Sequence, residues 1–389
     1  MKRIKKRDQE YIKQNNLKMI LDIIKNKRSI SRAEIVKITN MSPTSVSRIV
    51  GSLIDLGLVK ETETSSSGVG RKAILLDLDL ESVMTIGVYI NKHIINVGIV
   101  NFGGEILYRD KIELNPKGTH PDTLINKACA LIKDTIKKSK IDPSKIIGIG
   151  VSLPGIINSK NGEVIFSAPL SWENIHIAKV IESELNIKTV VDNDVKLKAL
   201  AESLYGVGRN SGKTALVNFG RGVGSALIID GEIFRGVTNI AGEIGHITID
   251  PNGILCECGR RGCLQTFIVE DNLIEEANKV KKIVDIKEIF EAAYIGESWA
   301  VSILDRAITY MCITINNIVC MYNPDTIVLS GSLVEVYPEI IKEVEEKCRT
   351  SIWTPLRGTF KILYSELKSE ADIIGPSTLA LDTFLSFDI

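Results

Sequence analysis

The 389-residue sequence lacks the features that mark membrane and secreted proteins. No apolar run reaches the ~18 residues that a membrane-spanning helix needs. The basic N-terminal segment MKRIKKRDQEYIKQ is not followed by the apolar core of a secretory signal peptide. We therefore expect a soluble, cytoplasmic protein without a membrane partner. With 44% hydrophobic and 25% charged residues, the chain has the composition of an ordinary globular protein with a sizeable core.

The chain also lacks net charge, but its charges are unevenly distributed. Residues 1–80 hold 16 of the 48 Lys and Arg and nine of the 48 Asp and Glu, so the remainder of the chain is acidic. A basic segment joined to an acidic body indicates a separate nucleic-acid-binding module. A merely solvated tail would account for residues 1–10 but not for the pattern that follows.

Residues 16–57 have the pattern of a helix-turn-helix. An apolar helical stripe runs through the first segment, and Ser31 with Glu34 fits a capping box that opens a second, short helix. Ser42 and Pro43 suit the start of a third helix, which would be the recognition helix. Its polar positions supply the candidate DNA-contacting residues Ser42, Thr44, Ser45, Ser47 and Arg48.

A hairpin is expected directly after this helix, over residues 58–78. Two strands are joined by the Ser/Gly-rich tip TSSSGVGRK, which is typical of the wing of a winged helix. Gly70 lets the backbone approach the duplex, while Arg71 and Lys72 can reach phosphates or the minor groove. The alternative, a small helical oligomerisation module, would not need a polar-faced helix followed by a basic hairpin.

From residue 82 strands and helices alternate, so the body is predicted to be α/β. Residues 84–108 and 214–236 share one order of strand, turn, strand, tight turn and strand, which predicts two related lobes with a cleft between them. Residues 298–322 are apolar nearly all round. They predict a buried helix with Cys312 and Cys320 as core thiols.

A polar cluster, Asp192-Asn193-Asp194, follows an apolar strand directly and precedes a helical pattern. Open α/β proteins bind their ligands at the carboxyl ends of strands. The pattern alone leaves open whether Asp194 is the general base of an enzyme or a group that only holds a ligand.

Three of the seven cysteines lie within eight residues, in the segment CECGRRGC. This clustering suits metal binding in a reducing compartment better than a disulfide framework. Cys256, Cys258 and Cys263, with His246 as the fourth ligand, predict a closed, structural Zn²⁺ site. The alternative is three free thiols and an unrelated histidine.

Four segments together, AGEIGHITI, CECGRRGC, VSLPGIIN and NPDTIVLSG, resemble the ROK family of sugar kinases and sugar-responsive repressors. The resemblance runs from about residue 82 to the C-terminus, and a winged helix is what the repressor branch adds. It implies a two-lobed, actin-like/ribonuclease-H-like body. We expect a winged helix-turn-helix domain over residues 1–80 and a ROK body over 81–389. Lobe one would hold about 81–195 and the C-terminal helix 371–389, and lobe two about 196–370.

The resemblance also implies a sugar site in the cleft. It carries sugar-contacting roles to Asn193, Asp194, Glu243 and His246. Paired acceptors of this kind suit a hydroxyl-rich ligand. The family's Glu two residues after the third Cys is Gln265 here, so an amide replaces a carboxylate at that contact.

The first phosphate loop of the family's kinases is altered in this chain. Those kinases read Asp-x-Gly-Gly-Thr where this sequence has Tyr89, the pair Asn91-Lys92, and His93. Bulky residues cannot reproduce a bare glycine turn, and the loss of the carboxylate removes a metal contact.

The second phosphate loop keeps Gly220, Gly222 and Gly224 but has Arg221 at a position that is usually Thr or small. A glycine-rich loop alone is weak evidence of phosphate binding. We therefore predict no catalytic residues and no enzyme activity. The alternative is an ATP-dependent sugar kinase with an accessory DNA-binding domain.

The sequence thus predicts a transcriptional repressor whose operator affinity is altered by a sugar bound between the lobes. The expected partners are double-stranded operator DNA, a second copy of the chain in a homodimer or higher homo-oligomer, and a sugar effector. A pentose, xylose, is the first choice of effector, and glucose or another hexose is the next.

Overall fold

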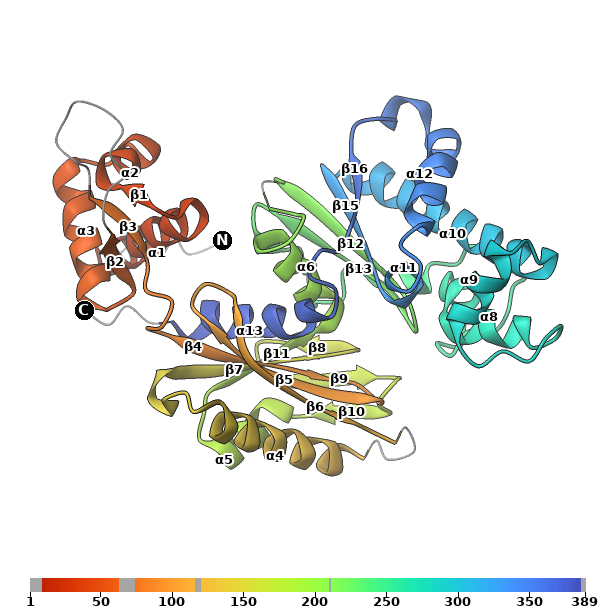
Figure 1. Ribbon diagram of the computed structural model, residues 1–389, viewed down its shortest axis with the longest axis horizontal. Helices are drawn as coiled ribbons and strands as arrows, with labels where there is room; N and C mark the ends of the chain where they lie inside the picture. The colour runs from red at the N-terminus through yellow and green to blue at the C-terminus, as the bar shows by residue number, and fades with distance from the viewer. Residues whose placement is uncertain (1–8, 63–73, 116–119, 210, 386–389) are drawn as a thin grey trace, which may run out of the picture.

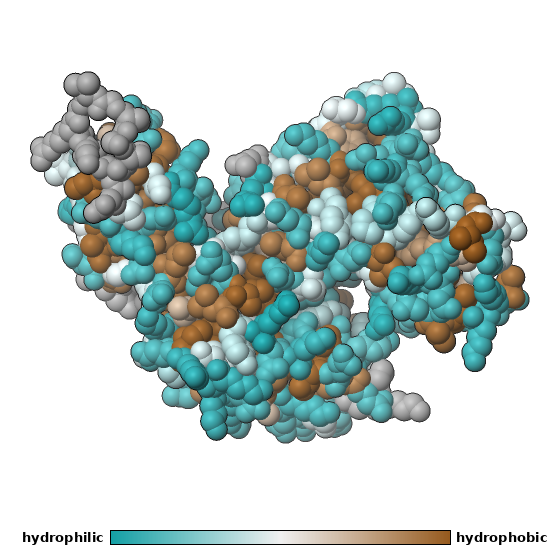
Figure 2. Space-filling model, in the orientation of Figure 1, coloured by the Kyte–Doolittle hydropathy of each residue, from teal (hydrophilic) through white to brown (hydrophobic). Residues whose placement is uncertain are grey.

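The computed structural model describes residues 9–62, 74–115, 120–209 and 211–385. Figure 1 shows three bodies: a small N-terminal domain, a lower lobe and an upper right-hand lobe, with helices α6 and α13 between the two lobes. The space-filling surface is hollowed between the two lobes (Figure 2). Within the described ranges, no helix is both long and apolar enough to span a membrane.

The N-terminal domain is a winged helix, as the sequence predicts. Its elements are α1 (Gln9–Lys27), β1 (Ile30–Ser31), α2 (Arg32–Thr39), α3 (Pro43–Asp55), β2 (Val59–Thr62) and β3 (Leu75–Leu78). The strands pair in the order β1-β3-β2. The capping box of Ser31 and Glu34 is confirmed, and the Ser42 hydroxyl accepts from the Ser45 N–H at 3.1 Å. The wing tip, with Gly70, Arg71 and Lys72, lies outside the described residues.

Lobe one is built on a five-stranded mixed sheet in the order β11-β7-β4-β5-β6. Strands β11, β7 and β4 are parallel, whereas β5 and β6 continue antiparallel. The lobe comprises β4 (Met84–Ile90), β5 (Ile94–Asn101), β6 (Ile106–Glu113), α4 (Pro121–Ser139), η1 (Pro143–Lys145), β7 (Ile146–Leu153), β8 (Ile156–Asn158), β9 (Glu163–Ser167), β10 (Trp172–Ile175), α5 (Ile177–Leu185) and β11 (Thr189–Asn193). Strands β8 to β10 form a separate small sheet.

Lobe two repeats the same strand order, β14-β13-β12-β15-β16, so the duplication read from the sequence is confirmed. Its strands are β12 (Lys213–Phe219), β13 (Val223–Ile229), β14 (Glu232–Ile233), β15 (Thr326–Ser330) and β16 (Lys361–Tyr364). Its helices are α6 (Asp194–Leu204), η2 (Ile244–His246), α7 (Gln265–Ile268), α8 (Glu270–Ala277), α9 (Ile286–Tyr294), α10 (Ser298–Tyr322), α11 (Ser332–Glu335), α12 (Ile340–Ser351), η3 (Thr354–Leu356) and η4 (Lys368–Glu370).

The last helix, α13 (Ala371–Phe384), returns from lobe two to cover the sheet of lobe one. The approach is close because β4 and β7 each present a glycine to the helix backbone. A Cβ on Gly87 would lie 2.0 Å from the carbonyl oxygen of Ile373, and one on Gly150 would lie 1.7 Å from that of Pro376. Side chains at these two positions would therefore push the helix off the sheet.

The core of the winged helix is continuous with the body. Leu381 of α13 and Phe102, which follows β5, are buried in the same apolar cluster as Leu17 of α1 and Val46 of α3. The N-terminal domain is therefore packed on lobe one rather than attached only through a linker.

Helix α10 is less buried than its apolar sequence predicts. Its inner face carries Cys312 in the core of lobe two, but Cys320 is exposed, so the expectation of a core thiol there is wrong. Met321 is 58% exposed and Ile313 is 38% exposed. Apolar content predicted burial on all sides, whereas within the described part of the chain one face of the helix is buried and Ile313, Cys320 and Met321 stay exposed.

Candidate functional site

Asn193 stands where strand β11 ends and helix α6 begins. Its side-chain oxygen accepts from the Lys196 N–H at 3.1 Å, so it caps the helix. Its amide donates to the carbonyl oxygen of Gly155 at 3.1 Å. The amide is thus held at one end by the backbone of α6 and at the other by the backbone of lobe one, and the residue is 7% exposed.

Asp194 and Glu243 bring two carboxylates to the junction of the lobes. Asp194 is the first residue of α6, and Glu243 precedes the 3₁₀ turn η2 of lobe two. Burial raises the pKa of Asp194, although the charge of Lys198 opposes the shift. Burial also raises the pKa of Glu243; Lys196 and His246 lower it, and the charge of Asp194 adds to the rise. The two carboxylates are therefore close enough to repel each other.

Lys196 is a site residue that the sequence reasoning missed. It is 2% exposed, and its ammonium donates to the backbone carbonyl oxygen of Asn239 at 2.8 Å. Burial lowers the pKa of Lys196, while the charges of Asp192 and Glu243 raise it. A lysine that close to two carboxylates offsets part of their charge in a poorly solvated place.

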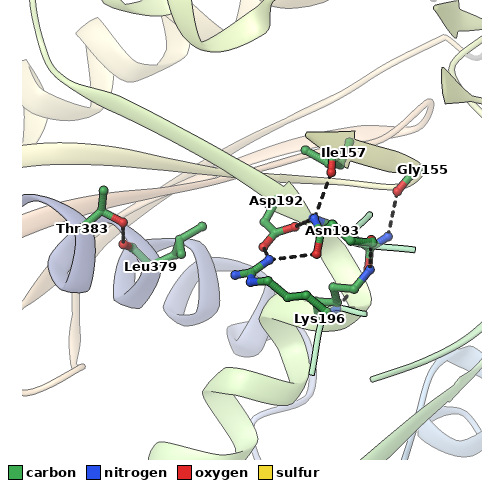
Figure 3. A network of polar contacts seen from close by, with 9 residues as sticks. Gly155, Ile157, Asp192, Asn193, Lys196, Leu379 and Thr383 are labelled. Atoms are coloured by element: carbon green, nitrogen blue, oxygen red, sulfur yellow. Dashed lines mark hydrogen bonds and ion pairs between the residues drawn. The ribbon is translucent and has the colours of Figure 1, made fainter. Parts of the chain in front are cut away.

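A hydrogen-bonded network around Asp192 joins the two lobes (Figure 3). Asp192, at the end of β11, is 0% exposed, and its carboxylate accepts from Arg235 and, at 3.0 Å, from the amide of Asn239. The Asn239 amide also donates to the carbonyl oxygen of Ile157 at 2.9 Å. The segment 235–239 of lobe two is thereby fixed on the strand end that carries Asn193 and Asp194. Only the polar run 192–194 hinted at this network in the sequence.

The four predicted metal ligands lie together. One ligand atom from each of His246, Cys256, Cys258 and Cys263 falls within a group whose members are all within 4.8 Å of one another. Two isolated β-bridges, between residues 248 and 263 and between 255 and 261, fold the knuckle onto the segment that follows η2. The cluster thus braces the loop that carries Glu243, three residues before His246.

Arg260 and Gln265 contact the cysteine cluster from outside it. Hydrogen bonding from the Arg260 backbone lowers the pKa of Cys258 to about 6, against the effect of burial. The Arg260 guanidinium also donates to the carbonyl oxygen of His246 at 2.9 Å. The Gln265 amide lies 3.4 Å from Sγ of Cys256. Gln265, a predicted sugar contact, is thus positioned against the cysteine cluster.

The space beside Asp194 is occupied by the side chains Tyr89, Lys198 and Asp372. The Lys198 ammonium lies 3.2 Å from a carboxylate oxygen of Asp372. Burial raises the pKa of Tyr89, and the charges of Asp372 and Asp194 add to the rise. The Tyr89 hydroxyl accepts from the Asn91 amide at 2.9 Å. Tyr89, Lys198 and Asp372 thus lie close enough to Asp194 for their charges and its own to act on one another.

The second glycine loop is also engaged by its own chain. The Gly220 N–H donates to the carbonyl oxygen of Gly222 at 3.2 Å, and the Gly220 carbonyl accepts from the Glu270 N–H. The Arg221 guanidinium lies 3.8 Å from the Glu270 carboxylate. Burial lowers the pKa of His93, and the charges of Arg221 and Lys92 lower it further.

On the N-terminal domain, the predicted DNA-contacting residues divide into two sets. Ser42 and Ser45 are joined by a 2.9 Å hydroxyl contact in the cap of α3. Thr44, Ser47 and Arg48 are exposed on the face opposite the buried stripe. The exposed Thr44, Ser47 and Arg48 can meet base edges, whereas Ser42 and Ser45 fix the start of the helix.

Comparison with known proteins agrees with this architecture. The ROK family model matches residues 85–383, three quarters of the chain. The chain belongs to the ROK family. A MarR family model matches residues 18–72, the winged helix ahead of the ROK body.

Two curated relatives match almost end to end. The xylose repressor of Bacillus subtilis (strain 168) is 27% identical over 381 residues, which is 97% of this chain and 98% of that protein. The DNA-binding transcriptional dual regulator NagC of Escherichia coli (strain K12) is 27% identical over 376 residues, 94% of this chain and 92% of that protein.

Among solved structures, a ROK family transcriptional regulator described as a homolog of E. coli MLC protein superposes with a TM-score of 0.81. It is 24% identical and covers 95% of this chain and 96% of its own. A ROK family glucokinase from Streptomyces griseus, in complex with glucose and AMPPNP, gives a TM-score of 0.68 at 23% identity. It covers 77% of this chain and 99% of its own. Both likenesses concern the fold.

Proposed function

We propose that the protein is a sugar-responsive, DNA-binding transcriptional repressor. The proposal rests on one observation: the chain packs a winged helix onto a ROK body, and it matches repressors over nearly its whole length. The exposed Thr44, Ser47 and Arg48 of α3 would enter the major groove, and the wing residues Gly70, Arg71 and Lys72 would meet the backbone or minor groove.

The sugar would bind at the junction of the lobes. Asp194 and Glu243 would each accept hydrogen bonds from vicinal hydroxyls, with Asn193, His246 and Gln265 as neighbouring polar contacts. Because Asp194 directly follows strand β11 of lobe one and Glu243 lies in lobe two, a ligand bridging them would favour one arrangement of the lobes. The first candidate is xylose, since repressors named for xylose are among the relatives. Glucose, another hexose and N-acetylglucosamine follow.

A sugar kinase is the rival function, and the filled space beside Asp194 argues against it. The Lys198 and Asp372 pair and the half-buried Tyr89 lie beside Asp194, so a phosphate donor would have to share that space with them. Phosphoryl transfer relies on positioning the phosphoryl group and on stabilising its charge next to the attacking hydroxyl. We therefore propose that the cleft binds sugar without transferring phosphate to it.

We also propose a structural Zn²⁺ held by His246, Cys256, Cys258 and Cys263. Three thiolates and one imidazole are donors that Zn²⁺ prefers, and four of them complete a tetrahedral shell. Because four protein ligands would fill its shell, the ion would brace the knuckle and would have no position left for a catalytic water molecule. It would fix the loop that carries Glu243.

A homodimer is the proposed assembly, and lobe two offers an apolar surface for it. A cavity of about 300 Å³ is lined mainly by Ile240, Ile244, Ile313, Ile318 and Met321. Tyr322 also lines it, and its ring centroid lies 6.3 Å from that of Phe234; both rings belong to residues about two-fifths exposed. Exposed apolar surface of this kind marks an interface. A second copy would place two recognition helices on successive major grooves of a pseudo-palindromic operator.

Gel-shift titration of a DNA fragment from the chain's own promoter, with xylose, glucose and N-acetylglucosamine in turn, tests the proposal. We expect tight binding that one of these sugars alters. Absence of DNA binding, or binding indifferent to every sugar, contradicts it. A coupled assay of ADP release with the same sugars separates the rival, because sustained turnover lost in Asp194→Asn would establish a kinase.

A further inference from the structure

Helix α6 connects the proposed sugar site with the N-terminal domain. Its 11 residues, Asp194–Leu204, form a rod of roughly 16 Å. Asn193 caps one end, beside Asp194. Tyr205 caps the other end, where its N–H donates to the carbonyl oxygen of Ala201 at 2.8 Å. A displacement of the first turn is therefore carried directly to Tyr205.

Tyr205 contacts the winged helix through Lys25. The Lys25 ammonium lies over the Tyr205 ring, 5.2 Å from its centroid, in a cation–π arrangement. Lys25 belongs to the last turn of α1. The Tyr205 ring also packs against Gly104 in the β5–β6 turn, where an added Cβ would lie only 2.3 Å from Cε1 of Tyr205. The ring is thus confined between lobe one and α1.

The charges around Lys25 keep it in its cationic form. Burial lowers the pKa of Lys25. Tyr205 and the carboxylates of Asp382 and Asp22 raise it by more than burial lowers it, so the net shift is upward. Asp382 belongs to α13 and Asp22 to α1. The ammonium therefore remains charged at physiological pH and lies over the Tyr205 ring, with the carboxylates of Asp382 and Asp22 near enough to act on its charge.

Helix α6 is tied to its neighbours along its length, so it is expected to move as one body. The buried Glu202 carboxylate accepts from the Ser365 hydroxyl at 2.6 Å and from the Leu367 N–H at 2.9 Å. A Cβ on Gly375 of α13 would lie 2.2 Å from the Leu197 carbonyl oxygen. Packing this close transmits a shift rather than absorbing it.

We propose that α6 couples sugar binding to operator affinity and that the Tyr205–Lys25 contact is the coupling contact. The inference rests on the proposed repressor function. Sugar held by Asp194 would shift α6, and Tyr205 would move Lys25 and with it α1. Helix α1 packs on the recognition helix α3, through Leu17 and Val46 among others, so its position changes how α3 fits the operator.

Variants at the two ends of the contact test this coupling. Lys25→Gln removes the cation and keeps a helix-compatible stem; Tyr205→Ala removes the ring. Both should bind the promoter fragment and the sugar within about threefold of the original protein. The factor by which saturating sugar changes the operator Kd should fall at least fivefold, which is within the range of measured couplings.

Matched variants separate loss of the contact from general damage. Lys27→Gln makes the same change two residues away, at an exposed position of the same helix end, and should leave the coupling factor unchanged. Lys25→Arg and Tyr205→Phe retain the cation and the ring and should keep most of the coupling. The double variant Lys25→Gln/Tyr205→Ala should lose no more than either single one, because both disrupt one contact.

The probes are the promoter fragment with xylose, glucose and N-acetylglucosamine, and the readouts are gel shift and calorimetry. Full coupling in both Lys25→Gln and Tyr205→Ala overturns the proposed contact while the repressor function stands. Coupling lost equally in Lys27→Gln also overturns it. An unaltered protein that binds the fragment but responds to no sugar overturns the repressor proposal and the coupling with it.

Discussion

Arg235 of lobe two donates to the fully buried carboxylate of Asp192 at the end of β11 in lobe one. The same carboxylate accepts from Asn239, and the Lys196 ammonium holds the Asn239 carbonyl. The network therefore fixes the segment after β14 on the strand end that presents Asn193 and Asp194. Each lobe supplies part of the environment that the other lobe's site residues need.

Removal of Arg235 should leave the Asp192 charge buried without its cation. We expect Arg235→Met to lower the free energy of unfolding by about 3 kcal/mol, as for other buried ion pairs that lose one partner. Urea unfolding followed by circular dichroism measures it. Arg221→Met is the matched control: its side chain is 52% exposed and 3.8 Å from Glu270, so it should cost less than about 1 kcal/mol. Equal losses in the two variants would contradict this role of Asp192.

Loss of one zinc ligand should release the metal and loosen the knuckle. Cys258→Ser should lose most of the bound Zn²⁺. Its melting temperature should also fall, because a structural ion contributes folding free energy. Atomic absorption and thermal denaturation check it. Cys320→Ser removes an exposed thiol outside the cluster and should retain the ion. Unchanged metal content in Cys258→Ser would refute the site.

Asp194→Asn keeps the shape of the side chain but removes its charge. We expect sugar affinity to fall at least tenfold, since a hydrogen bond to a charged group contributes about 1.5–3 kcal/mol. Affinity for the promoter fragment without sugar should remain unchanged. Isothermal calorimetry with the sugar that alters operator binding provides the measurement. Asp134→Asn, on the exposed side of α4, is the control, and equal sugar affinity in both variants argues against the assignment.

Arg48 is exposed on α3 and should contact DNA directly. Arg48→Ala is expected to weaken operator binding about tenfold or more, which corresponds to the 1–3 kcal/mol of a base contact. Fluorescence anisotropy at several salt concentrations then distinguishes the kind of contact. A reduced salt slope with uniform weakening indicates a phosphate partner, whereas relaxed sequence preference indicates a base. Arg349→Ala, at the end of α12, should change neither quantity.

Asp372 makes stability depend on pH. Burial raises its pKa to about 6, with Lys198 opposing the rise. The folded protein therefore holds this proton more tightly than the unfolded chain, and the associated stability is lost as pH rises from about 4 to about 6. The effect is up to about 3 kcal/mol. Relative to the original protein, Asp372→Asn should become more stable as pH rises over this interval. Urea unfolding at about pH 4.5 and pH 7 tests it, and a difference that does not change with pH contradicts it.

The sequence predicted the features that depend on local pattern. The Ser31 and Glu34 capping box needs only a spacing of three residues, and the lobe duplication repeats one order of strands and turns. The pairing of Asp192 with Arg235 and Asn239 was not predictable in this way. These residues are 43 and 47 positions apart, and only the folding of two lobes against each other brings them together.

The same limit explains the error on α10. Its apolar residues surround the helix, so the pattern predicted burial on every side. Composition does not say how many neighbours a helix has within its own chain. Cys320 and Met321 lie on a side that the described chain leaves open. That side adjoins the apolar cavity for which we propose a second copy of the protein.

The position of α13 has a consequence for synthesis of the protein. Helix α13 is made after the winged helix and both sheets, because a chain is synthesised from its N-terminus. Yet Leu381 belongs to the apolar core of the winged helix, and the backbone of α13 covers the glycines of β4 and β7. The winged helix therefore cannot complete its packing until α13 has been synthesised. A polypeptide without α13 would have an incompletely packed winged helix. Only molecules that contain α13 are therefore expected to compete for the operator.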